Sequence, residues 1–295
     1  MKQFLKLRDL HPRRFFTDTW HALDAERFAS ASAESTFERK GNPGLVAYIF
    51  SVATVSIILQ EYIGTTPFFL SIVNFIDDPG AAVSSPLLYH ALGWLRPDGS
   101  TLKTWLITSG NYELFALCYW ASWRVLGFLV IPLIAVGVHP GLKKRALGFT
   151  VKGMKSHLWV YAVLFLPVLV AVVIVSFFDE FQEYYPFYTK AHESVADFVI
   201  WESFYVAQFF SLEFFFRGFM IQPLRKELGS GAIFAMMIPY VMIHIGKPMI
   251  ECFAAIIAGI VLGTLAMRTR SIWSGFLIHV SVALSMDLLS IWQKM

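Results

Sequence analysis

Long apolar runs alternate with short polar connections along most of the chain. A helix needs about 20 apolar residues to cross roughly 30 Å of hydrocarbon, and a segment inside a bilayer must satisfy its own backbone hydrogen bonds. The pattern therefore predicts an all-α fold, a polytopic membrane helix bundle with about seven transmembrane helices. The predicted spans are residues 44–62, 114–138, 159–178, 195–222, 232–245, 250–267 and 272–292.

The connection between the first two spans, residues 63–112, is long and poor in charge. Its apolar pieces, such as 67–76, are shorter than a span and are separated by breakers such as Pro79 and Gly80. Pieces of this length are typical of interfacial or re-entrant segments, so we expect short interfacial helices beside the spans. The chain then divides into a leader at 1–43, an N-terminal transmembrane part at 44–190 and a C-terminal helical core at 191–295.

Composition agrees with the membrane class. Hydrophobic residues make up 56% of the chain and charged residues 15%, with a mean hydropathy of +0.58. An ordinary soluble domain has about 25% charged residues. Nothing in the sequence supports nucleic-acid binding. The two cysteines, Cys118 and Cys252, both lie in apolar runs, so we expect packing roles and no disulfide.

Basic residues gather on every second connection between spans. They lie in the leader, in 140–157, in 223–230 and at Arg268 and Arg270. Because Lys and Arg beside spans favour the cytoplasmic side, we expect the N-terminus in the cytoplasm and the C-terminus outside. The leader lacks the apolar core of a signal peptide, so the first span is expected to direct insertion. The leader itself is interpreted as a solvated arm with some amphipathic helix.

Four ionisable residues, Glu213, Arg217, His244 and His279, lie inside predicted spans. Such residues are costly in hydrocarbon and usually mark a function. Counted at ~1.5 Å per residue, the Glu and the two His lie about 10 to 18 Å from the cytoplasmic boundary, so they can share one layer. Glu213 and Arg217 are spaced i, i+4 and can pair along one face. The structural alternative is an ion pair between helices with two hydrogen-bonded packing histidines.

Three further carboxylates accompany this group. Glu202 precedes Glu213 by three helical turns and lies on nearly the same face. Asp287 follows His279 by two turns on one face, and Glu251 begins the sixth span. Glu202 and Asp287 are equally compatible with a site and with a scaffold.

A carboxylate and two imidazoles in a water-accessible pocket are sufficient for hydrolysis. The carboxylate can take a proton from water, one imidazole can orient that water, and the other can stabilise the developing oxyanion. The same Glu213, His244 and His279 could also bind a divalent metal such as zinc. The residues alone allow both.

These residues resemble the motifs of the CPBP family of intramembrane proteases, which includes the CAAX prenyl endopeptidases and the Abi proteins. The family pattern is a pair of Glu with a following Arg, then Phe-xxx-His, then His-xxx-Asn or a similar polar residue, on consecutive helices. The corresponding segments here are Leu212–Gly218, Tyr240–His244 and His279–Ala283. The resemblance covers roughly 195–292.

Two positions depart from that pattern. Leu212 stands where the family has its first glutamate, the residue assigned to water activation, and Ala283 replaces the polar residue after the last histidine. Glu213 is therefore expected to take over as the base. Asp287 is expected to substitute in part for the missing polar residue by holding the imidazole of His279, and Glu251 could lean toward the site.

The resemblance implies an intramembrane endopeptidase that hydrolyses a peptide bond of a membrane-associated protein or peptide. Glu213 would activate water, His244 would assist it, His279 would donate to the oxyanion and Arg217 would keep the carboxylate ionised. It also implies an integral protein of a bacterial inner membrane whose partners are its substrate and the lipid bilayer. The alternative is a catalytically inactive CPBP-fold scaffold or immunity protein. A transporter is a weaker alternative, because the polar residues lie in one half of the chain.

Overall fold

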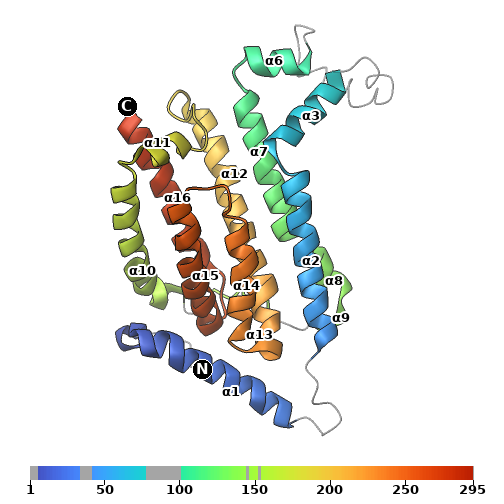
Figure 1. Ribbon diagram of the computed structural model, residues 1–295, viewed down its shortest axis with the longest axis vertical. Helices are drawn as coiled ribbons and strands as arrows, with labels where there is room; N and C mark the ends of the chain where they lie inside the picture. The colour runs from blue at the N-terminus through green and yellow to red at the C-terminus, as the bar shows by residue number, and fades with distance from the viewer. Residues whose placement is uncertain (1–5, 34–41, 78–100, 144–145, 152–153, 295) are drawn as a thin grey trace.

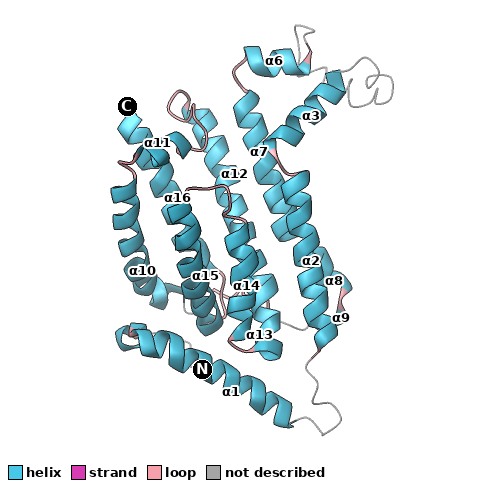
Figure 2. Ribbon diagram, in the orientation of Figure 1, coloured by secondary structure: helices cyan, strands magenta, loops and turns pink. Residues whose placement is uncertain are grey.

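A computed structural model describes residues 6–33, 42–77, 101–143, 146–151 and 154–294. Within these ranges the chain forms helices and no strand (Figure 2). Most helices run side by side in one bundle, and one helix crosses its end (Figure 1). The all-α expectation is thereby confirmed.

Six helical segments are long and apolar enough to span a membrane. Two of them join an α-helix to a π-helical turn without a break. The segments are α2 (Pro43–Tyr62), α7 (Tyr112–Val125) with η3 (Leu126–Val130) and α8 (Ile131–Val138), α10 (Met154–Val175), α12 (Val195–Glu213) with η4 (Phe214–Ile221) and α13 (Gln222–Leu228), α15 (Met249–Thr269) and α16 (Trp273–Lys294).

The remaining predicted span, 232–245, is a shorter helix. It forms α14 (Gly231–Met242), which has 12 residues. Pro239 lies inside this helix and its ring nitrogen can donate no hydrogen bond. The chain continues as turns through 243–248 before α15 begins. A half-length helix followed by irregular backbone places His244 on a loop.

Two glycines allow α15 to pack closely on α14. A Cβ at Gly259 would lie 3.1 Å from a carbon of Met237, and one at Gly263 would lie 3.0 Å from a carbon of Ile233. Lipid is as apolar as these side chains, so helices in a membrane associate through close packing rather than through the hydrophobic effect. The GxxxG spacing therefore serves helix contact, as its pattern predicts.

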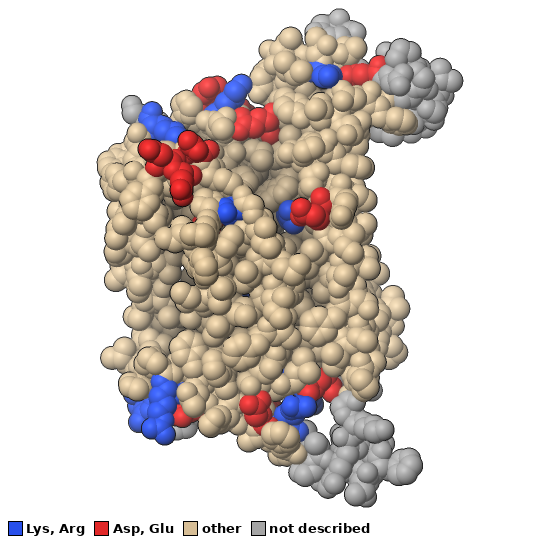
Figure 3. Space-filling model, in the orientation of Figure 1, with Lys and Arg blue, Asp and Glu red and all other residues tan. Residues whose placement is uncertain are grey.

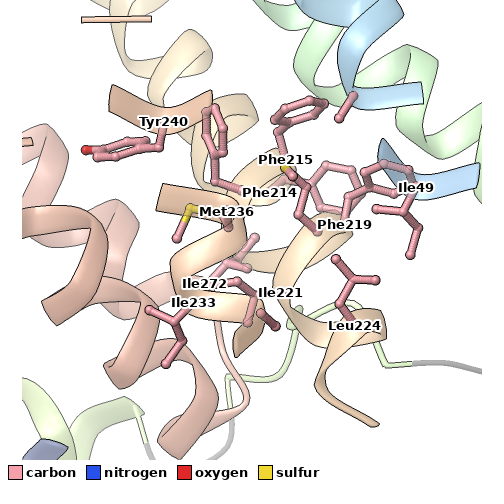
Figure 4. Packing of buried hydrophobic residues seen from close by; sticks show 14 of the residues in the cluster. Ile49, Phe214, Phe215, Phe219, Ile221, Leu224, Ile233, Met236, Tyr240 and Ile272 are labelled. Carbon is pink, nitrogen blue, oxygen red and sulfur yellow. The ribbon is translucent and has the colours of Figure 1, made fainter. Parts of the chain in front are cut away.

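The continuous segment α12–η4–α13 is the axis of the bundle. All eight residues of η4 are buried. Figure 4 shows Phe214, Phe215 and Phe219 of this turn directed toward Ile49 of α2 and Tyr240 of α14. A segment surrounded by protein on all sides can carry polar groups that lipid would exclude, and Glu213 and Arg217 lie on it.

Short helices occupy the end of the bundle opposite α1 (Figure 1). They are α3 (Thr66–Asp77), α6 (Leu102–Thr108) and α11 (Asp179–Tyr184). Asp77 accepts hydrogen bonds from the backbone N–H groups of Leu102 and Lys103, so it joins α3 to the start of α6. The expected short helices in 63–112 are present at both ends of that connection.

The described part of the leader, residues 6–33, is not a solvated arm. It forms η1 (Leu7–Leu10), η2 (Arg13–Thr17) and α1 (Asp18–Ala33), which lie across one end of the bundle (Figure 1). Trp20 Nε1 donates to Thr264 Oγ1 at 3.2 Å, and Asp24 accepts from the backbone N–H of Ser230 at 2.8 Å and from its hydroxyl at 2.9 Å. Phe15 is buried in a cluster with side chains of α10, α15 and α16. These contacts fix the leader to the bundle.

Charged side chains on the visible face gather near the two ends of the molecule, and a broad band between them is mostly uncharged (Figure 3). Such a band is what a bilayer requires of the surface that faces its hydrocarbon. The described N-terminal segment and the C-terminus lie at opposite ends (Figure 1).

Candidate active site

Glu213 and Arg217 form an ion pair in the centre of the bundle. Arg217 Nη1 lies 3.0 Å from Glu213 Oε1, and neither side chain is exposed. Glu213 is the last residue of α12 and Arg217 lies within η4. The i, i+4 spacing thus joins the two across the point where the helix changes type. A buried carboxylate is stable only with such partners.

His279 of α16 completes the surroundings of this carboxylate. Its Nδ1 lies 2.9 Å from Glu213 Oε1. An ionised carboxylate only accepts, so Nδ1 carries the hydrogen and donates. A neutral imidazole in this tautomer keeps the Nε2 lone pair as a hydrogen-bond acceptor. The side chain of His279 is 16% exposed while Glu213 is fully buried, so the imidazole is the more accessible of the two.

Gly275 makes this approach possible. It lies one helical turn before His279 on α16 and so shares its face. A Cβ at this position would overlap Glu213 Oε2. Glu213 Oε2 is itself buried and has no hydrogen-bond donor among the described residues. The second carboxylate oxygen therefore lies against the backbone of α16.

Tyr240 lies between the two histidines. Its hydroxyl is 3.4 Å from His279 Nε2, and its ring centroid is 4.8 Å from that of His244. The guanidinium carbon of Arg217 lies 4.2 Å from the centroid of the same ring, which is a cation–π distance. Tyr240 therefore links the Glu213 cluster to the loop that carries His244.

His244 is held by the backbone. Its Nδ1 lies 2.7 Å from the carbonyl oxygen of Tyr240, so Nδ1 donates and Nε2 is left free in the neutral ring. Its own carbonyl accepts from Cys252 Sγ at 2.9 Å. Cys252, expected to be a packing residue, thus also contacts the backbone of this loop.

Lys247, Glu251 and Tyr185 form a polar group beside the His244 loop. Lys247 Nζ lies 3.3 Å from Glu251 Oε2, and the Tyr185 hydroxyl donates to Glu251 Oε1 at 3.0 Å. Burial, followed by the neighbouring Tyr205 and Glu251, raises the pKa of Tyr185 well above its usual value. The hydroxyl therefore stays protonated and keeps donating. Glu251 is engaged in this group and not with Glu213.

Asp287 does not hold His279. Its Oδ2 accepts from Trp201 Nε1 and its Oδ1 from the backbone N–H of Phe187, both at 3.4 Å. Both donors come from the α11–α12 side of the bundle, and they draw the carboxylate away from the imidazole. Glu202 is also buried, and its carboxyl group lies beside that of Asp287. These two carboxylates lie outside the Glu213 cluster.

The described residues include no group of three His, Cys, Asp or Glu side chains arranged to hold a metal ion. Glu213 Oε1 is occupied by Arg217 and by His279 Nδ1, and Tyr240 stands between the two imidazoles. The set Glu213, His244 and His279 therefore does not fit a three-ligand metal site.

Sequence reasoning missed two residues of this site. Tyr240 belongs to a motif but is not predicted as a site residue, and Gly275 belongs to no motif. The i, i+4 spacing from Tyr240 to His244 and from Gly275 to His279 would have placed each on the face of its histidine.

Comparison with known proteins supports the resemblance. Residues 194–285 match the family model described as Type II CAAX prenyl endopeptidase Rce1-like. No curated protein and no solved structure matches the chain. The matched region contains Glu213, Arg217, His244 and His279, and with six membrane-spanning helices it indicates an integral membrane protein. The similarity to the Rce1-like type II CAAX prenyl endopeptidases therefore extends over residues 194–285, which is less than half of the chain.

Proposed function

We propose that this protein is an intramembrane endopeptidase. The observation that carries the proposal is the contact of the buried Glu213 carboxylate with Nδ1 of the more exposed His279, within the region that matches the CAAX endopeptidase family. A carboxylate that holds an imidazole through one nitrogen leaves the other nitrogen ready for proton transfer. Water or a substrate carbonyl could meet this nitrogen in the bundle interior.

The surroundings of Glu213 favour a division of roles that differs from the sequence expectation. One carboxylate oxygen faces two donors and the other lies against Gly275, so Glu213 is poorly placed to reach water. We assign water activation to His279 Nε2, with Glu213 as the positioning residue and Arg217 as its counterion. Nε2 takes a proton from water, the water oxygen attacks the peptide carbonyl, and the same proton passes to the leaving amine when the C–N bond breaks.

Two groups beside His279 can stabilise this reaction. The Tyr240 hydroxyl, 3.4 Å from Nε2, is a hydrogen donor where negative charge develops on the carbonyl oxygen. His244 has a free Nε2 that can hydrogen-bond the water or the leaving group. The family description names a CAAX prenyl endopeptidase, and a CAAX motif is a C-terminal sequence whose cysteine is prenylated, so we propose a peptide with a prenylated cysteine near its C-terminus as the substrate class.

The test is a cleavage assay with full-length protein in liposomes and a fluorogenic CAAX peptide, prenylated or unmodified. We expect His279→Ala to lower kcat by roughly 100- to 10,000-fold, the range for loss of one proton-transfer group. The exposed loop variant His192→Ala is the matched control and should cleave normally. Glu213→Gln retains an acceptor for Nδ1 and should keep more activity than Glu213→Ala.

An equal loss of cleavage activity in Glu213→Gln and Glu213→Ala, with folding intact, would indicate that Glu213, and not His279, is the general base. Unchanged turnover in His279→Ala would reject the peptidase site and favour the inactive scaffold.

A further inference from the structure

The N-terminal segment forms a basic pocket at the end of the bundle. Two adjacent cavities of about 390 and 530 Å³ open beside η1 and η2. Arg8, Arg14 and Asp18 line both cavities, and Arg13 lines the larger one. Arg268 lines the smaller one. We propose that this pocket binds the phosphate of an anionic phospholipid headgroup.

The pocket is built by the fold. Arg268 of α15 donates from Nη1 to the backbone carbonyls of Asp9 at 3.2 Å and Arg14 at 3.3 Å. It therefore joins η1 to η2 and fixes the floor of the pocket. Thr19 Oγ1 donates to the same Arg14 carbonyl at 3.1 Å. The backbone around Arg8, Arg13 and Arg14 is thus held by Arg268 and Thr19, and not by the side chains of those three arginines.

The side chains of Arg8, Arg13 and Arg14 form no ion pair within the described residues and are free to bind a ligand. All three residues are exposed, and no ion pair joins them to a carboxylate of the described residues. Guanidinium groups bind phosphate through paired N–H donors and keep their charge at all relevant pH values. Three such groups around one cavity form a site for a phosphate.

Two aspartates also line the pocket, and they restrict the kind of headgroup that can bind there. Asp18 lines both cavities and Asp9 the smaller one, so the larger cavity has the stronger positive charge. A carboxylate repels phosphate but accepts a hydrogen bond from a hydroxyl group. A headgroup with both a phosphate and free hydroxyls, such as that of phosphatidylglycerol, matches this mixture better than a bare phosphate.

The position of the pocket favours a lipid over a soluble phosphate. Phe15 is buried in one cluster with Val160 of α10, and Phe16 and Trp159 pack against the same cluster. Only 17% of the α10 span is buried, so the rest of this apolar helix is available to acyl chains. A lipid phosphate in the pocket would leave its chains beside α10. Basic residues near a membrane surface are attracted to anionic headgroups.

The test uses native mass spectrometry of the full-length protein in detergent, with phosphatidylglycerol or phosphatidylcholine of matched chains. We expect phosphatidylglycerol to bind the wild type and to bind R13A/R14A at least tenfold more weakly, following the contribution of about fivefold per basic residue at a membrane surface. Arg27→Ala removes an exposed arginine of α1 that lines neither cavity and should bind as the wild type. R13K/R14K keeps the charge but loses the paired N–H donors, so it should bind more weakly than the wild type and more strongly than R13A/R14A.

Several outcomes would overturn the proposal. Equal binding of phosphatidylcholine, or an equal loss in Arg27→Ala, would show that the pocket does not select the headgroup. Stabilisation by inorganic phosphate that depends on Arg13 and Arg14, without phosphatidylglycerol binding, would assign the site to a soluble ligand. Thermal unfolding in lipid-free detergent should be the same for R13A/R14A and the wild type, so a loss of binding cannot be attributed to unfolding. The peptidase proposal plays no part in these measurements.

Discussion

The Glu213 carboxylate depends on the absence of a side chain at Gly275. The carboxylate needs a place inside the bundle where it meets both Arg217 and His279, and the flat backbone of α16 at Gly275 provides it. A single methyl group there would compete with Glu213 Oε2 for the same volume. The site is thus as sensitive to this glycine as to its charged members.

Gly275→Ala should destabilise the protein by about 1–3 kcal/mol, the usual range for overpacking, and should displace Glu213 from His279. Thermal unfolding in detergent and the cleavage rate measure the two effects. Gly137→Ala is the matched control, because a Cβ at Gly137 would meet no atom within 4 Å. It should be neutral or slightly stabilising, since alanine favours the helix. A similar response of both variants would contradict the steric account.

Much of the site could be predicted from residue spacing. The i, i+4 relation predicts the contact between Glu213 and Arg217, and the depth estimate predicts that His279 lies in the same layer; both contacts are present. The spacing places Tyr240 and Gly275 on the faces of the two histidines, but their contacts with Arg217 and Glu213 could not be predicted, because these depend on how α14 and α16 are rotated against α12. A hydrophobic pattern gives the face of a helix but not its register against a neighbour.

Among the helices, α14 differs most from its sequence expectation. Its apolar run continues to Ile245, yet the helix ends at Met242 and the chain turns. Side chains that the run does not contain hold this turn: Lys247, Glu251 and Tyr185. A hydropathy pattern contains no information on such contacts, so it predicts neither the end of α14 nor the loop position of His244.

Glu251→Ala should loosen the loop 243–248 without unfolding the bundle. It removes the partner of Lys247 and the acceptor of the Tyr185 hydroxyl. Hydrogen bonds to charged groups contribute about 1.5–3 kcal/mol, so amide exchange in this loop should rise by roughly tenfold or more. Hydrogen–deuterium exchange of the loop peptides measures this. Glu183→Ala, which removes an exposed carboxylate of α11, is the control. Equal exchange in both variants would show that Glu251 does not hold the loop.

Asp24→Ala should weaken the start of α14. The carboxylate accepts from the backbone N–H and the hydroxyl of Ser230, the residue that precedes the helix. Loss of a group that satisfies a helix N-terminus costs about 0.5–2 kcal/mol. Chemical or thermal unfolding should show a decrease in this range, and Asp24→Asn should recover part of it. No change in stability would mean that the leader is not a structural part of the bundle.

At the scale of the whole molecule, the seven apolar runs and the short helices of 63–112 were predicted from hydropathy alone, because bilayer thickness fixes helix length. The docking of the leader was not predicted. It depends on single contacts such as Trp20 with Thr264 and Asp24 with Ser230, which join residues far apart in the sequence. The many polar residues of the leader predict a solvated segment, whereas η1, η2 and α1 lie across the end of the bundle.

The N-terminus is expected in the cytoplasm and the C-terminus outside. The leader and α16 end at opposite ends of the bundle, and the leader lies at the same end as Arg225, Arg268 and Arg270. Basic residues beside spans favour the cytoplasmic side. Fusions of a reporter that is active only in the cytoplasm should give signal at the N-terminus and none at the C-terminus. The reverse pattern would overturn the assigned orientation.

The π-helical segment η4 sets the rotation of α13 relative to α12. Each residue of an α-helix turns the chain by about 100°, so deleting one residue between Phe214 and Ile221 would rotate α13 by roughly that amount relative to α12. Arg225 on α13, which pairs with Glu26 of α1, would then face another direction. The number of residues in η4 therefore fixes the rotation of α13 relative to α12. A one-residue change in this turn would separate Arg225 from Glu26 although neither residue is altered.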